Sequence, residues 1–144
     1  MNDKSPEKKE IAPELYRKIL HGLDLKNLFL TSCSSAIDRI NIGTEIKIRI
    51  DDNASFRKTE NNEIEISQKY SLEARGQNSK RKFLAIKCEF CLVFSSKEEF
   101  SEEFFETFKK ANLPINSWPF FREFVYNMTS RMYVPPLTIP LLKR

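Results

Sequence analysis

The sequence predicts an α+β fold in which helices pack on one face of a four-stranded antiparallel sheet. The apolar period is helical near the N-terminus, changes to two between residues 23 and 95, and becomes helical again afterwards. With 144 residues, 40% of them hydrophobic, the chain is long enough for one core and too short for two. We expect a single domain over 11–144 after a charged, flexible tail over 1–10.

The first ordered element is a predicted helix over residues 11 to 22. Pro13 suits a first helical turn, and Gly22 is a natural stop. The apolar residues on one side of this helix are Leu15, Ile19 and Leu20. The pattern predicts a short N-terminal helix with one buried side.

Four strands follow, with apolar residues at alternate positions. In EIKIRID, isoleucines alternate with charged residues, which predicts one buried face and one solvated face. The connections after the second and third strands are polar and rich in turn-forming residues, so the last three strands should form an antiparallel meander. The predicted strands are 23–32, 45–51, 63–75 and 82–95.

The stretch from residue 33 to residue 44 is predicted to be a loop of another kind. It is too long for a tight hairpin. It also carries Ile37, Ile40 and Ile42, which a solvent-exposed loop has no reason to contain. These isoleucines need a packing partner or a ligand.

The first helix after the strands is predicted to begin either at Ser96 or near Ser101, since glutamates follow both serines in positions that suit a helix N-terminus. Asn112 and Pro114 end it. Its apolar stripe consists of Phe100, Phe104, Phe105 and Phe108. This stripe is expected to cover part of the sheet.

The last helix is predicted to be capped by Asn116 or Ser117, with Pro119 in its first turn. It ends near Met132, before the prolines at 135–136 forbid continuation. Its main apolar stripe consists of Phe121, Phe124, Val125, Met128 and Met132.

This last helix carries more apolar residues than packing on a sheet requires. The residues beyond the main stripe are Trp118, Phe120, Tyr126 and Tyr133. Covering the sheet explains part of the helix. An adaptable surface rich in methionine and aromatic residues is also what a protein uses to bind many unlike apolar segments. Both interpretations stay open on this pattern alone.

Few residues suggest catalysis or cofactor binding. Three glycines leave no dinucleotide-binding or phosphate-binding motif. The single histidine, His21, lies beside a helix end, and Cys88 and Cys91 lie in one strand, where side chains three apart point to opposite faces. The glutamates between residues 98 and 106 share the solvated side of a helix. We therefore predict no enzyme, no catalytic residue, no metal and no cofactor.

Charge gives little support for nucleic-acid binding. The net charge of +4 indicates a mixed surface and not a basic stripe. The basic residues that cluster at a predicted turn are Arg75, Lys80, Arg81 and Lys82. A small nucleic-acid-binding sheet protein stays an alternative, but nucleic acid is not an expected partner.

The composition favours a cytoplasmic protein. There is no run of about 18 apolar residues, which predicts no membrane insertion. The polar N-terminus MNDKSPEKKEI lacks the apolar segment of a signal peptide. Three cysteines, an odd number, fit a reducing compartment better than a disulfide framework.

The stretches EIKIRIDDNASF, EIEISQKYSLEA and LVFS precede a motif near the end of the chain. The residues of this motif are Pro119, Arg122, Glu123, Met128, Ser130, Arg131, Pro135, Leu137 and Ile139. In order and spacing, the motif resembles the last-helix motif of the SecB family of protein-export chaperones, and the three stretches are similar to that family's second to fourth strands. The resemblance extends from about Glu45 to the C-terminus.

This resemblance implies a SecB-like fold and an ATP-independent holdase that keeps unfolded polypeptides or preproteins soluble for export. It also implies a homodimer or homotetramer. In that family the clients lie in apolar grooves between the last helix and a crossover loop after the first strand. The positions that correspond here, and that we predict to bind clients, are Ile37, Ile40, Ile42, Phe120, Phe124, Met128 and Met132.

The chain departs from the exporters of that family in its charge and its C-terminus. Those proteins are acidic and end in a tail that recruits the SecA motor, whereas this basic chain ends in LLKR. Lys87 stands where the family's sheet surface tends to be acidic. SecA binding is therefore not expected. The alternative is a dedicated chaperone of an antitoxin in a toxin–antitoxin module, the role of a smaller branch of the family.

Overall fold

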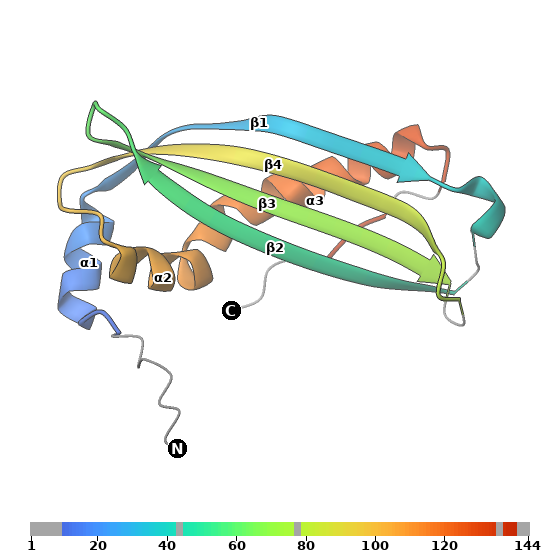
Figure 1. The fold of residues 1–144 in the computed structure, drawn as a ribbon, viewed down its shortest axis with the longest axis horizontal. Helices are drawn as coiled ribbons and strands as arrows, with labels where there is room; N and C mark the ends of the chain where they lie inside the picture. The colour runs from blue at the N-terminus through green and yellow to red at the C-terminus, as the bar shows by residue number, and fades with distance from the viewer. Residues whose placement is uncertain (1–9, 43–44, 77–78, 135–136, 141–144) are drawn as a thin grey trace, which may run out of the picture.

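The computed structural model describes residues 10–42, 45–76, 79–134 and 137–140. It confirms the predicted α+β class (Figure 1). The predicted tail over 1–10 lies outside the described residues except for Glu10. The elements in chain order are α1 (Pro13–His21), β1 (Leu23–Ile37), the 3₁₀ helix η1 (Arg39–Asn41), β2 (Ile46–Lys58), β3 (Glu63–Gly76), β4 (Lys82–Ser96), α2 (Glu102–Ala111) and α3 (Leu113–Arg131).

The four strands form one antiparallel sheet in the order β1-β4-β3-β2. The predicted meander of β2, β3 and β4 is confirmed. Because β1 pairs with β4, the chain must cross the end of the sheet to begin β2 at the opposite edge, and η1 lies in this crossover. Helices α1 and α2 gather at one end of the sheet, and η1 lies at the other (Figure 1).

Both edge strands are longer than predicted. Residues 33–37 are not a loop, because Cys33 pairs with Cys88 of β4 and the ladder continues to Ile37 and Leu84. The serines in this stretch give no alternating apolar signal, and two register shifts earlier in β1 also interrupt the period of two. An edge strand with much of its surface in water needs no such alternation.

The same physical reason explains the error in β2. We predicted that residues 52–58 belong to a polar connection, but they continue β2, with Asp52 opposite Tyr70 and Lys58 opposite Ile64. Most side chains of β2 are exposed. Its polar sequence is therefore compatible with an outer strand held by backbone hydrogen bonds to β3.

The two C-terminal helices meet at Asn112, the predicted end of α2. Ser101 is the N-cap of α2, since its Oγ accepts a hydrogen bond of 3.1 Å from Phe104 N. Helix α3 begins at Leu113, earlier than predicted, so Pro119 lies inside it. Ser117 is not a cap: its Oγ donates to Leu113 O and lies 2.6 Å from the hydroxyl of Tyr70.

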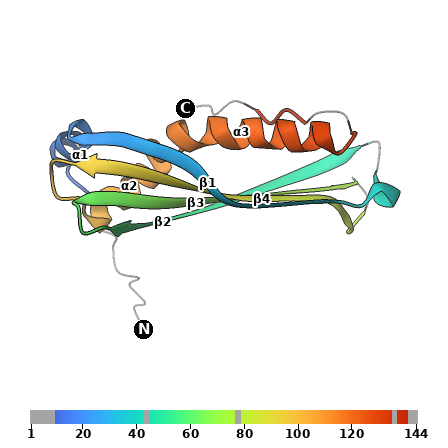
Figure 2. The same ribbon diagram turned by 90° about the horizontal axis from the view of Figure 1, so that it is seen from above.

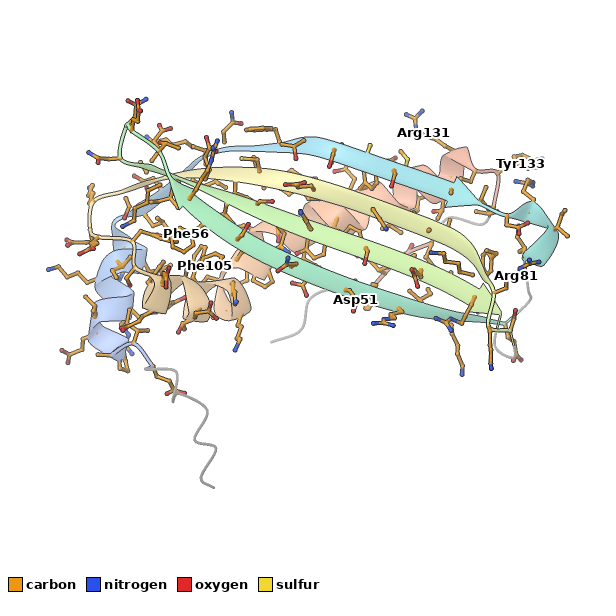
Figure 3. The ribbon with its side chains drawn as sticks, viewed as in Figure 1. Asp51, Phe56, Arg81, Phe105, Arg131 and Tyr133 are labelled. Carbon is orange, nitrogen blue, oxygen red and sulfur yellow. The ribbon has the colours of Figure 1, made fainter. Side chains whose placement is uncertain are left out.

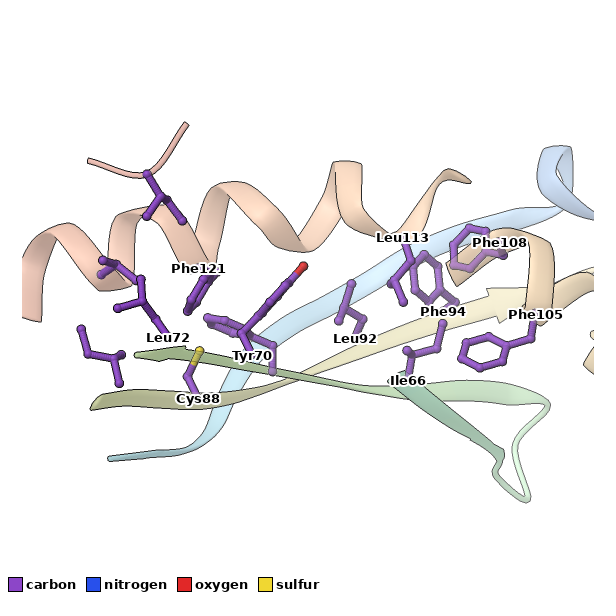
Figure 4. Packing of buried hydrophobic residues seen from close by; sticks show 14 of the residues in the cluster. Ile66, Tyr70, Leu72, Cys88, Leu92, Phe94, Phe105, Phe108, Leu113 and Phe121 are labelled. Atoms are coloured by element: carbon purple, nitrogen blue, oxygen red, sulfur yellow. The ribbon is translucent and has the colours of Figure 1, made fainter. Parts of the chain in front are cut away.

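The core lies between the sheet and the helices (Figures 2 and 4). Helix α3 lies along one face of the sheet (Figure 2). Buried side chains alternate along β3 and β4. The ring centroids of Phe94 and Phe108 are 5.7 Å apart, which joins β4 to α2, and those of Tyr70 and Phe121 are 4.5 Å apart, which joins β3 to α3. Both helices therefore cover the same face of the sheet.

Candidate functional site: an apolar surface on α3 and the crossover

Helix α3 presents apolar side chains beyond those that seal the core. Phe121 and Val125 are fully buried against the sheet. Phe120, in contrast, is 45% exposed, and its ring centroid lies 6.4 Å from that of Phe90 on β4. Phe124 and Met128 are partly buried beside the core. We call Phe120, Phe124 and Met128 the α3 row; together they leave apolar surface in contact with water.

The three predicted isoleucines of the crossover have different environments. Ile37 is the last residue of β1 and packs partly buried against the core. Ile40, in η1, is 92% exposed, and Ile42 is also exposed. The turn is held by Asp38, whose Oδ1 accepts from Ile40 N at 3.1 Å and whose own N donates to Phe83 O at 2.7 Å. Ile40 is therefore fixed in an exposed position.

A hydrogen bond holds the crossover to the end of α3. Arg39 Nη1 donates to Met132 O at 2.6 Å. The next residue, Tyr133, has a φ of 58° and is 89% exposed. Tyr133 lies beside η1 (Figure 3). Two almost fully exposed apolar side chains, Ile40 and Tyr133, thus lie at the same end of the molecule.

The structure divides the predicted client-binding residues into two groups. Met132 belongs to the group at the crossover, because its backbone carbonyl accepts the hydrogen bond from Arg39. Phe120 lies 12 residues earlier, about 18 Å away along the helix axis at about 1.5 Å per residue. The predicted residues are therefore spread along α3 from Phe120 to its C-terminal end and onto the crossover, an arrangement that suits an extended ligand.

Sequence reasoning missed Arg39. The sequence signal for it is the charged pair Asp38 and Arg39 between Ile37 and Ile40. It also missed the exposed apolar side chains on the two edges of the sheet, which are Leu25, Phe29, Leu30, Ile46 and Ile48. Edge strands also have outward backbone groups without a neighbouring strand, so these edges are surfaces on which another chain can add.

The cysteines have the geometry predicted for them. Cys88 is buried, and Cys91 points to the opposite face of the sheet, beside Ser67 and Glu89. Burial raises the pKa of the Cys88 thiol to about 12, so this thiol stays protonated at neutral pH and is a weak nucleophile. Within the described ranges, no group of three His, Cys, Asp or Glu residues is placed to hold a metal ion.

The face of the sheet opposite the helices carries both signs of charge. Arg57 pairs with Glu65 at 2.6 Å, and Lys82 pairs with Glu73 at 3.2 Å. Of the basic cluster, Lys80 and Arg81 are exposed. Arg81 lies beside the start of β4 (Figure 3). At Arg57 and Lys82 the paired carboxylates reduce the positive potential that a phosphate backbone would meet.

The fold is that of SecB-like chaperones, as the sequence resemblance implied. The chain matches no known family model and no curated protein sequence. The SecB-like chaperone Rv1957 of Mycobacterium tuberculosis, solved with a ChAD peptide from the Rv1956 HigA1 antitoxin, superimposes with a TM-score of 0.78 at 17% identity, over 91% of this chain and 98% of that chain. A protein of unknown function from Streptococcus agalactiae matches with a TM-score of 0.42 at 13% identity, over 83% of this chain and 97% of that one.

No helix in the described part of the chain is both long and apolar enough to cross a membrane.

Proposed function

We propose that this protein is an ATP-independent, non-enzymatic chaperone that binds unfolded polypeptides or preproteins and keeps them soluble. The observation that carries the proposal is the band of exposed and half-exposed apolar side chains along α3 and the crossover, on a SecB-like fold. The proposed client-binding residues are Ile37, Ile40, Ile42, Phe120, Phe124, Met128 and Met132.

The chemistry of these side chains supports a role in binding extended apolar segments. Phenylalanine contributes a large apolar area, and methionine adapts its shape to different partners. A surface of this kind distinguishes poorly between sequences and favours any exposed apolar stretch. An unfolded chain offers such stretches, whereas a folded protein has buried them.

We further propose that the protein works as a homodimer or homotetramer in the cytoplasm. The exposed apolar side chains on β1 and β2 support self-association, because pairing between copies would bury them together with the open strand edges. The cytoplasmic location rests on the sequence composition alone.

The second candidate function is that of a chaperone dedicated to one antitoxin. It is favoured by the SecB-like chaperone of Mycobacterium tuberculosis, whose structure contains a peptide from an antitoxin. A toxin–antitoxin gene pair beside this protein's gene, with selective and stable binding of that antitoxin, is the result expected of this candidate. Equal binding of unrelated unfolded proteins is the result expected of a general holdase.

The proposal is tested by measuring the native mass by light scattering, alone and with a reduced, unfolded test protein, together with aggregation of that protein. We expect a symmetric oligomer that prevents aggregation at a stoichiometric ratio without ATP. A folded bovine serum albumin control, added in equal mass, should have no effect. A monomer that leaves aggregation unchanged would contradict the proposal.

A further inference from the structure

The segment 137–140 runs back along α3 in the direction opposite to the helix. Leu137 N donates to Thr129 Oγ1 at 2.9 Å, Arg122 Nε donates to Ile139 O at 2.8 Å, and Trp118 Nε1 donates to Pro140 O at 2.9 Å. Each later residue of the segment thus meets an earlier part of α3. We call this segment the strap.

All three hydrogen bonds join side chains of α3 to backbone atoms of the strap. Backbone atoms are the same in every polypeptide, so these contacts do not depend on the sequence of the bound segment. The identity of the side chains matters only at alternate positions of the strap. Ile139 is 1% exposed and Leu137 is half-buried, whereas Thr138 between them is exposed. The strap therefore has the contacts of an extended peptide ligand with apolar residues at alternate positions.

The strap lies on a different side of α3 from the α3 row. Trp118, which holds the strap, packs against Tyr70 of β3 with ring centroids 5.8 Å apart. Phe120, at the start of the α3 row, packs against Phe90 of β4. The helix thus has apolar surface on both sides, and the strap covers one of them.

The polar groups that hold the strap have other hydrogen-bond partners when the strap is absent. The hydroxyl of Thr129 also donates to Val125 O at 2.9 Å, so this buried group keeps a hydrogen bond when the strap leaves. Arg122 and Trp118 are only partly buried, so water can replace the carbonyls that they bind. If the strap left, the apolar surface under Ile139 would be exposed to water. Only another apolar segment could cover that surface again.

We infer that the side of α3 formed by Trp118, Arg122 and Thr129 is a docking site for extended peptides with branched apolar residues at alternate positions, and that the strap occupies it as an intramolecular competitor. This inference rests on the peptide-binding function proposed above. A client must displace the strap, so the strap limits binding to segments that offer comparable apolar side chains.

The test compares the wild-type chain with a strap-weakened variant, Leu137→Ser with Ile139→Ser, and with the matched control Thr138→Ser. The probe is a fluorescent synthetic peptide of sequence VPPLTIPLL, which repeats residues 134–142. By fluorescence anisotropy, the strap-weakened chain should bind the peptide about tenfold more tightly than the wild type, since removal of a competitor restores the fraction of free sites. The Thr138→Ser chain should bind as the wild type does.

Adding Arg122→Met and Thr129→Val to the strap-weakened chain should reverse the gain, because two of the groups that hold the peptide backbone are then lost. Equal binding by the wild-type and strap-weakened chains, with matching circular dichroism, would overturn the inference.

A second variant keeps the inference testable if the strap-weakened chain does not fold. Arg122→Met with Thr129→Val leaves the apolar side chains of the strap in place but releases its backbone. Hydrogen exchange of the Leu137 amide should become faster in this variant, and an unchanged rate would contradict the inference.

If neither the wild-type nor any variant chain binds unfolded protein, the proposed function fails and the inference with it. Binding by the wild type that no strap variant alters overturns the inference alone.

Discussion

Replacing Phe120 and Met128 together with serine is expected to weaken binding of an unfolded polypeptide about tenfold or more while the fold remains. Full burial of one such side chain is worth about 1.5–3 kcal/mol. Because both are already partly covered in the free protein, we expect about half of that from each, and about 1.4 kcal/mol corresponds to a factor of ten in affinity. The measurement is the Kd for a labelled, reduced and carboxymethylated protein, with circular dichroism as the check on folding.

A matched control is available on the same helix. Ile115 and Tyr126 are exposed apolar residues of α3 outside the α3 row, so Ile115→Ser with Tyr126→Ser removes a similar apolar area. We expect this control to keep nearly the wild-type affinity. An equal loss in both double variants would show that general hydrophobicity of α3, and not the α3 row, determines binding.

The largest expected effect on stability is that of Phe121→Ala. Phe121 is 0% exposed, and its ring lies 4.5 Å from that of Tyr70 and 5.7 Å from that of Trp118, centroid to centroid. Truncating a buried phenylalanine costs about 3–5 kcal/mol, because transfer energy is lost and a cavity remains. Urea denaturation followed by circular dichroism measures this loss in the free energy of unfolding.

Phe120→Ala, one residue away on the same helix, is the control for that prediction. Phe120 is half exposed, so we expect a loss of about 1 kcal/mol in the free energy of unfolding. Losses of equal size for the two variants would contradict the division of α3 into a sheet-facing side and an open row.

The sequence predicted the inner part of the fold better than its edges. Strands β3 and β4 were predicted within one residue because buried positions alternate along both of them. Strands β1 and β2 were predicted too short, since most of their side chains are exposed and only backbone pairing reveals their full length. Amphipathic periodicity depends on one buried face, and edge strands give a weak signal of it.

The candidate site could be predicted only in part. The spacing of three and four residues predicted the apolar stripe of α3, and the isoleucines indicated that the crossover is a candidate binding segment. The hydrogen bond from Arg39 to Met132 joins residues 93 positions apart, and that from Arg122 to Ile139 joins α3 to the strap. The residue pattern of a single helix or loop cannot predict such contacts, because they depend on how distant parts of the chain pack against α3.

The most direct test of the central claim is to locate a bound client by photo-crosslinking. Benzoylphenylalanine is placed singly at position 40, 81, 87 or 120 of the full chain, and an unfolded, carboxymethylated protein is added before illumination. We expect strong crosslinks from positions 40 and 120, on the crossover and the α3 row, and weak ones from positions 81 and 87, at the basic turn and on the open face of the sheet. Crosslinks mainly from positions 81 and 87 would contradict the account.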